Sequence, residues 1–273
     1  MYLGLRDAQV IYVGWSLFEG LKELGVQSFE LKLNRDLQTP AGYDLSNKDG
    51  MNRLIEDLER YNIVVNAVLV ENDFAKTLNR EVDYILKGME IAWSLGCDVV
   101  RINGFMEPLT GYGEERVIST IVEGVEKVRR MAEYPVMLAV ENHGEATNDI
   151  NILRRILVET DEDFLGVTLD TGNFFFHGES NRELIHEIYR EVAGRVLHTH
   201  MKNVRVANGN VKMAPLYEEG EVDFQYVIEV LLREGYERDI TVEDESLGKL
   251  RPEERKEVLR RDVEFLRKIV KEV

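Results

Sequence analysis

The chain has a single cysteine, Cys97, which excludes an internal disulfide. Cys97 begins an apolar run, where we expect a buried and unreactive thiol, and this cysteine usage fits a reducing cytoplasm. Positive charge is also scarce: 34 Lys and Arg residues stand against 51 Asp and Glu, a net charge of -17. With no long Lys/Arg cluster to overcome this negative field, nucleic acid is not an expected partner.

Long hydrophobic runs are absent as well. No segment approaches the roughly 20 apolar residues that span a bilayer, and the N-terminus MYLGLRDAQV lacks a basic region followed by an apolar stretch. We therefore expect neither membrane insertion nor export.

With five prolines and no Ser/Gly-rich tract to serve as a linker, the 273 residues are expected to form one domain, 1–273. Four Gln beside many Glu, Lys and Arg favour a thermophilic source, although sixteen Asn weaken that interpretation.

What the sequence does contain is a repeated pattern of short β-branched runs, each followed by a stretch with helical periodicity. This alternation is typical of βα units around a parallel sheet, and eight units predict a (β/α)8 TIM barrel. The predicted strands are Tyr2–Leu5, Val26–Leu33, Ile63–Val70, Asp98–Asn103, Val136–Glu141, Leu165–Asp170, Val196–Met201 and Ile240–Asp244.

Glycines and one proline mark the predicted helix boundaries. Gly25, Gly96 and Gly235 each follow a helical pattern and precede a strand, where a left-handed residue ends the helix. Pro252 precedes a C-terminal helix whose apolar residues should close the barrel. The longest stretches predicted to be irregular all follow strands, where a barrel keeps its functional loops: Asn34–Lys48, Gly104–Gly113 and Lys202–Gly220.

Four predicted strands end in polar residues: VMLAVENHG, GVTLDTGN, RVLHTHMKN and DITVEDES. Strands buried on both faces should be apolar throughout, so Glu141, Asp170, His200 and Glu243 are expected at one end of the barrel. Three converging carboxylates would repel one another unless a cation lay between them, and a divalent ion with one imidazole ligand removes that conflict. Carboxylate-rich ligation favours Mn, Mg or Co, with Zn also possible.

Each of these residues has a plain structural alternative when taken alone. Glu141 or Glu243 could cap a helix, Asp170 could begin a turn, and His200 could be a core histidine with its hydrogen bonds satisfied. Their joint position at the ends of four consecutive strands favours a shared site.

These motifs resemble those of the xylose isomerase-like barrel superfamily, which includes ketose 3-epimerases, hydroxypyruvate isomerase, inosose dehydratase and endonuclease IV. The resemblance covers nearly the whole chain. It rests on the Glu of VENHG, the Asp of LDTGN, the second His of HTH with Lys202 after it, and the Glu of TVEDES. The run EEGEVDFQYVIEVLLREGY adds to it, because it resembles a Gly-x-Val-Asp-Phe pattern of the family.

The resemblance implies residue roles. The two glutamates that bind metal in the family's epimerases also move protons, which implies this role for Glu141 and Glu243. Lys202 would stabilise a developing oxyanion, unless it is a solvated surface lysine. Asn142 and His143 could orient Glu141 or contact substrate hydroxyls, or could serve only as loop hydrogen-bond partners.

The chain also departs from the family pattern. Asn173 stands where the sugar epimerases and endonuclease IV have a histidine; an asparagine can donate to a substrate oxygen but is a poor metal ligand, so we expect Asn173 to bind substrate. The histidines of a three-zinc cluster are also missing, which argues against repair of abasic DNA. The candidate for the substrate-binding arginine of the epimerases is Arg205, one position out of register. Trp15 and Phe18 could line the substrate pocket, or they could pack the first helix against its neighbours. We interpret Glu30 and Glu71 as salt-bridge or loop residues, and His177 and His186 as loop and surface-helix residues.

We therefore expect a metal-dependent isomerase or epimerase that acts on a ketose, keto-acid or polyol through an enediolate. An inosose-type dehydratase is the enzymatic alternative, and a non-catalytic sugar- or metal-binding barrel is the other. The sequence leaves open the identity of the sugar, its phosphorylation, and whether the chain forms a homo-oligomer.

Overall fold

The computed structural model describes residues 1–177, 181–207 and 209–273. Eight parallel strands form one sheet in the order β10-β1-β2-β3-β4-β5-β6-β7. Their bounds are β1 Tyr2–Arg6, β2 Ser28–Leu33, β3 Val64–Val70, β4 Val99–Ile102, β5 Met137–Glu141, β6 Leu165–Asp170, β7 Val196–His200 and β10 Asp239–Val242. The predicted strands are thus all present, with ends that differ by at most two residues.

The two outer strands of this sheet meet and bring the barrel close to full closure. Just past β7, Met201 N donates to Thr241 O at 2.7 Å, and Glu243 N donates back to Met201 O at 3.0 Å. The pairing is parallel like the rest of the sheet. Every C-terminal strand end therefore lies at the same end of the barrel, as in the TIM barrel predicted from the sequence.

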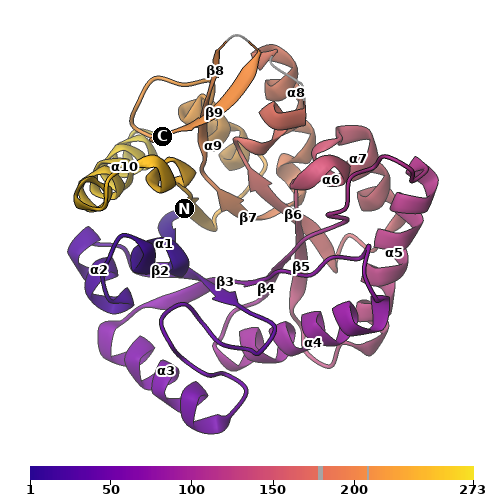
Figure 1. The fold of residues 1–273 in the computed structure, drawn as a ribbon, viewed down its shortest axis with the longest axis horizontal. Helices are drawn as coiled ribbons and strands as arrows, with labels where there is room; N and C mark the ends of the chain where they lie inside the picture. Colours follow the sequence, from indigo (N-terminus) through magenta and orange to yellow (C-terminus); the bar gives the residue numbers. More distant parts are fainter. Residues whose placement is uncertain (178–180, 208) are drawn as a thin grey trace.

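Helices surround the strands (Figure 1). They are α1 Asp7–Tyr12, α2 Leu17–Leu24, α3 Lys48–Tyr61, α4 Leu78–Ser94, α5 Glu114–Met131, α6 Gly144–Asn148, α7 Ile150–Glu159, α8 Arg182–Val192, α9 Phe224–Arg233 and α10 Pro252–Glu272. Each of the longer helices buries one apolar stripe against the sheet: in α10, Leu259, Val263 and Leu266 are at most 1% exposed. None of the described helices is long and apolar enough to cross a bilayer.

The predicted glycine stops are confirmed. Gly25, Gly96 and Gly235 have φ values of 61°, 71° and 80°, a left-handed conformation that glycine adopts without a Cβ clash. Each turns the chain from the end of a helix toward the next strand.

One prediction is wrong. The stretch Lys202–Gly220, expected to be irregular, contains an antiparallel hairpin of β8 Asn203–Ala207 and β9 Asn210–Ala214. Its alternating segments, NVRVA and NVKMA, lack the continuous apolar run that marks the strands of the barrel. The hairpin rises from the C-terminal end of the barrel next to β7 (Figure 1).

Candidate metal centre

Four polar side chains meet at the C-terminal end of the barrel. Glu141, Asp170 and His200 are the last residues of β5, β6 and β7, and Glu243 directly follows β10. Each is at most 2% exposed. One ligand atom from each of the four lies within 4.8 Å of the others. The structure therefore brings together the four residues that the strand-end pattern singled out.

His200 lies between two of the carboxylates. Its Nδ1 atom is 2.7 Å from Glu141 Oε1 and 3.1 Å from Glu243 Oε2. Burial lowers the pKa of His200 to about 4, which keeps the imidazole neutral near pH 7. A neutral imidazole has one nitrogen lone pair free for a metal.

The described side chains around this cluster fit a divalent ion. One oxygen each of Glu141, Asp170 and Glu243 is buried and accepts no hydrogen bond of regular geometry from the described residues, although a cationic side chain lies nearby. The separations of at most 4.8 Å also suit ligands around one ion, because opposite ligands lie about 4–5 Å apart when each bond is roughly 2.0–2.6 Å long. Three carboxylates and an imidazole are hard or borderline donors, suited to Mg, Mn, Co or Zn.

Three cationic side chains balance the carboxylates, and the sequence analysis identified one of them. Lys202 Nζ is 2.6 Å from Asp170 Oδ2 and 3.4 Å from Glu243 Oε2, so Lys202 points into the site and is not a solvated surface lysine. The two that it missed are Arg6, which pairs with Glu243, and Arg101, which pairs with Glu141.

The sequence pattern around Arg101 could have indicated that it has a buried partner. It interrupts the apolar run VVRIN of β4, and a charge inside a buried strand requires a partner. Its side chain is 5% exposed, and burial lowers its pKa to about 10, so it still carries its charge near pH 7.

Glu30 is more deeply placed than we expected. It lies on β2, fully buried, where it accepts a hydrogen bond from Arg6 Nε at 2.8 Å and faces His200 Nε2 at 2.8 Å. The expected salt bridge is present, but the residue belongs to the barrel interior. Glu71, by contrast, is half exposed and pairs with Lys32 at the rim.

The two asparagines fix the chain around Asp170. Asn142 Nδ2 donates to Asp170 O at 2.9 Å, and Asn142 Oδ1 accepts from Asp170 N at 2.8 Å. Asn173 Nδ2 donates to Asn142 O at 2.9 Å, and its Oδ1 accepts from Lys202 Nζ at 3.1 Å. Asn142 therefore links β5 to β6, whereas Asn173 holds the Lys202 ammonium.

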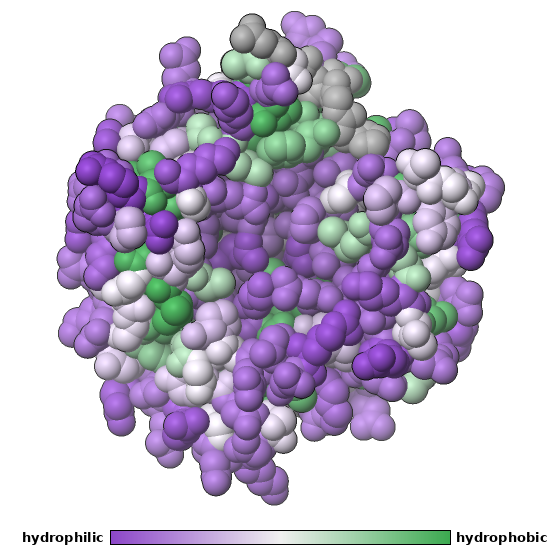
Figure 2. Space-filling view, in the orientation of Figure 1, coloured by the Kyte–Doolittle hydropathy of each residue, from purple (hydrophilic) through white to green (hydrophobic). Residues whose placement is uncertain are grey.

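A cavity of about 300 Å³ lies next to the cluster, which it reaches through His143 and Lys202. It is lined by His143, Gly144, Glu145, Asn148, Asn173, Phe176, Lys202, Met213 and Glu245. Figure 2 shows a hollow near the centre of this face, surrounded mostly by hydrophilic residues. His143 joins the cavity to the cluster, since its Nδ1 is 3.3 Å from Glu141 Oε2. Burial, then Arg101 and Lys202, lower the pKa of His143 to about 4, so it is neutral near pH 7.

Other candidates from the sequence lie elsewhere. Trp15 and Arg205 are not among the described residues that line the cavity: Lys256 lies 5.0 Å over the Trp15 ring, and Arg205 on β8 pairs with Glu218. Phe18 is buried and stacks on Tyr61, so it packs α2 against α3.

One more histidine also lies outside the cluster. His186, on α8, is half-buried and stacks on Tyr226 with ring centroids 3.9 Å apart. His177 ends a short 3-10 helix, Asn173–His177, and its side chain lies outside the described part of the chain.

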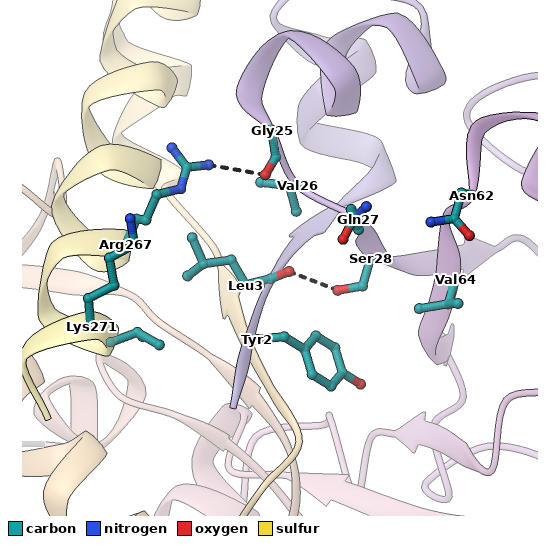
Figure 3. A pocket seen from close by; sticks show the side chains of 11 residues that line it. Tyr2, Leu3, Gly25, Val26, Gln27, Ser28, Asn62, Val64, Arg267 and Lys271 are labelled. Carbon is teal, nitrogen blue, oxygen red and sulfur yellow. Dashed lines mark hydrogen bonds between the residues drawn. The ribbon is translucent and has the colours of Figure 1, made fainter.

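A larger cavity of about 530 Å³ lies at the opposite end of the barrel. Figure 3 shows its lining, which includes Tyr2, Ser28 and Val64, the first residues of β1, β2 and β3. Arg267 of α10 donates to Gly25 O on one side of it, at 3.3 Å. In TIM barrels the N-terminal end serves stability and the C-terminal end carries the chemistry, so the smaller cavity is the candidate functional site.

The fold and the strand-end site define a TIM barrel with a candidate metal centre, and sequence comparison identifies the family. The model of the family described as "Xylose isomerase-like TIM barrel" matches residues 18–269. The chain belongs to this family, as the motif resemblance predicted.

Individual relatives are more distant. An inosose dehydratase of Geobacillus thermodenitrificans is 28% identical over 142 residues, and the match covers 46% of this chain and 46% of that protein. The chain thus spans about half the length of this curated relative.

Two solved structures share the fold. A D-tagatose 3-epimerase-like protein is 20% identical, with a TM-score of 0.72 over 99% of this chain and 100% of that one. The IolI protein, described with a bound zinc atom, is 18% identical, with a TM-score of 0.73 over 96% of each chain. Likeness at this level of identity concerns the fold.

Proposed function

We propose that the protein is a divalent-metal-dependent isomerase or epimerase that acts on a small ketose, keto-acid or polyol through an enediolate. The observation that carries the proposal is the set of four buried ligand atoms within 4.8 Å of one another, from Glu141, Asp170, His200 and Glu243. Family membership supports it, because the curated relative and the solved neighbours include proteins described as a dehydratase and an epimerase-like protein.

The bound ion would supply polarisation of the substrate carbonyl, which acidifies the neighbouring C–H bond. Glu141 and Glu243 reach the site from β5 and β10, and these two carboxylates would remove and return the proton. Lys202, held by Asp170 and Asn173, would stabilise the oxyanion that forms on the substrate.

The cavity favours a small substrate without a phosphate group. Its volume of about 300 Å³ is at the low end of ligand pockets, which span roughly 300–1,000 Å³. Among the described residues that line it, Lys202 is the one lysine or arginine, and it already contacts Asp170. Glu145 and Glu245 add negative charge at the rim, which would repel a phosphate.

The test is proton exchange. Purified protein with added Mn is incubated in deuterated water with a panel of free ketoses, an inosose and ketose phosphates. We expect deuterium beside the carbonyl of at least one free sugar, and a loss of roughly 10²- to 10⁴-fold in rate for Glu141→Gln and for Glu243→Gln. Glu71→Gln, at the exposed rim, is the control and should keep the wild-type rate.

Mass spectrometry of the same reactions separates the alternatives. The curated relative is an inosose dehydratase, and a product lighter by one water would assign this chain to that reaction, which begins with the same proton removal. Absence of exchange for every sugar, with metal bound, would refute the enzymatic proposal and favour a non-catalytic binding barrel.

A further inference from the structure

A chain of buried polar side chains continues from the metal centre into the barrel. Glu30 Oε1 faces His200 Nε2 at 2.8 Å and His198 Nε2 at 3.3 Å. On its other side, His198 Nδ1 is 2.8 Å from Asp239 Oδ2. All four residues are at most 1% exposed. No step of the proposed reaction uses Glu30, His198 or Asp239.

We propose that Glu30 is a positioning residue: it accepts the Nε2–H of His200 and so leaves the Nδ1 lone pair facing Glu141, Asp170 and Glu243. This inference rests on the proposed metal site. A metal-ligating histidine commonly donates its other ring N–H to a carboxylate, which fixes the ring orientation and the tautomer.

The contacts of Glu30 define the direction of this hydrogen bond. Arg6 Nε donates to Glu30 Oε2 at 2.8 Å, which leaves Oε1 as the carboxylate oxygen that faces His200. A carboxylate that is paired with a guanidinium is an acceptor, so the His200 nitrogen that faces it, Nε2, is the donor.

His198 contacts the same Glu30 oxygen as His200 does, and Asp239 contacts His198. His198 and His200 are two residues apart on β7 and therefore point to the same face of the strand. Asp239 Oδ2 also accepts a hydrogen bond from Thr241 Oγ1 at 2.7 Å, which fixes the carboxylate that His198 contacts. The imidazole of His198 thus has a defined orientation toward Glu30.

Glu30, His198 and His200 also form a possible three-ligand metal group. We favour the positioning role because the Arg6 guanidinium bonded to Glu30 would repel a second cation there. The number of ions bound per chain distinguishes the two roles.

The experiment measures Zn²⁺ binding to the full-length chain by titration calorimetry, with Glu30→Gln and Glu30→Met compared with wild type. We expect one ion per chain and a dissociation constant weaker by roughly 10- to 100-fold for Glu30→Met. Glu30→Gln retains an acceptor oxygen without the charge, so its effect should be smaller. It decides the test if Glu30→Met fails to fold.

Glu81→Gln is the matched control. Glu81 on α4 is likewise a buried glutamate paired with an arginine, Arg35, at 2.9 Å, but it lies outside the cluster. It should lose stability and keep wild-type Zn²⁺ affinity, because a loss of buried charge pairing by itself does not change the ligand set.

Imidazole ¹⁵N spectra of the Zn²⁺-loaded protein provide a readout independent of activity. The chain has five histidines, so a His200→Gln spectrum assigns the resonances of interest. We expect a slowly exchanging Nε2–H on His200 in wild type, and its loss or a marked shift in Glu30→Met. Wild-type Zn²⁺ affinity together with an unchanged His200 spectrum in both Glu30 variants would overturn the inference.

Two further results distinguish failure of the positioning role from failure of the proposed function. Two ions per chain in wild type and one in Glu30→Met would make Glu30 a ligand and would also overturn the positioning role. If wild type binds Zn²⁺ and Glu30→Met weakens it, but no sugar is turned over, the proposed function fails while the role of Glu30 stands.

Discussion

The replacement of Asp7 by Asn should change the pH dependence of stability. Asp7 is fully buried at the start of α1, and both of its carboxylate oxygens lie 3.2 Å from Lys32 N. Burial is the main reason that its pKa rises from 3.8 to about 8, helped by the neighbouring charge of Glu30. The folded state therefore holds the Asp7 proton more tightly than the unfolded state does.

The sign and size of the effect of Asp7 on stability follow from proton linkage. The contribution of Asp7 to stability is complete below about pH 4 and is lost as pH rises toward 8. A shift of about four pKa units corresponds to about 6 kcal/mol across the window, at roughly 1.4 kcal/mol per unit. Because Asn imitates the neutral acid, Asp7→Asn should gain stability over wild type by about 4 kcal/mol between pH 4.5 and pH 8.

The assay is urea unfolding of both proteins at several pH values, in EDTA so that metal binding does not contribute. Asp262, whose pKa burial raises to about 9, titrates in the same window but is present in both proteins and cancels in the difference. If the stability difference between the two proteins stays constant from pH 4.5 to pH 8, Asp7 is ionised in the folded protein and the reasoning is refuted.

Two further predictions concern single side chains. Burial raises the pKa of the Cys97 thiol to about 12, so it should not react with a thiol reagent such as dithionitrobenzoate at pH 8 until the protein unfolds, and rapid labelling of the native chain would contradict this. Arg101→Met leaves Glu141 buried without its partner and should destabilise the metal-free protein by about 3–5 kcal/mol. Saturating Mn should reduce that loss in thermal unfolding, and an equal loss with and without Mn would argue against Glu141 as a ligand.

The sequence was sufficient for the barrel and for the four residues of the cluster because both depend on local patterns. A polar residue at the end of an apolar strand is visible in one segment, and parallel strands then place all such ends together. Glu141 and His200 come together in this way although they are 59 positions apart.

The partners of these residues could not be predicted by the same reasoning. Arg6 contacts Glu243 across 237 positions, and Glu30 faces His200 across 170, so the pairings depend on how β1, β2, β7 and β10 meet at the seam of the barrel. Periodicity places a side chain on the inner or outer face of a strand, but it does not define which opposite strand that side chain reaches. Arg101 was detectable as a charge within an apolar run, yet nothing local named Glu141 as its partner.

The balance of charge at the centre connects these residues to the proposed chemistry. Glu30, Glu141, Asp170 and Glu243 carry four negative charges, against three positive charges on Arg6, Arg101 and Lys202. Asp239 and His198 cancel, because although burial opposes the charge on His198, Asp239 and Glu30 raise its pKa to about 9. This set is thus left with one negative charge, to which Glu245, 3.5 Å from Lys202, adds at the rim, and a divalent ion would offset the excess that disfavours an anionic enediolate. The three fixed cations by themselves would not offset that excess, and for this reason the proposed reaction requires the ion as well as the two proton-moving glutamates.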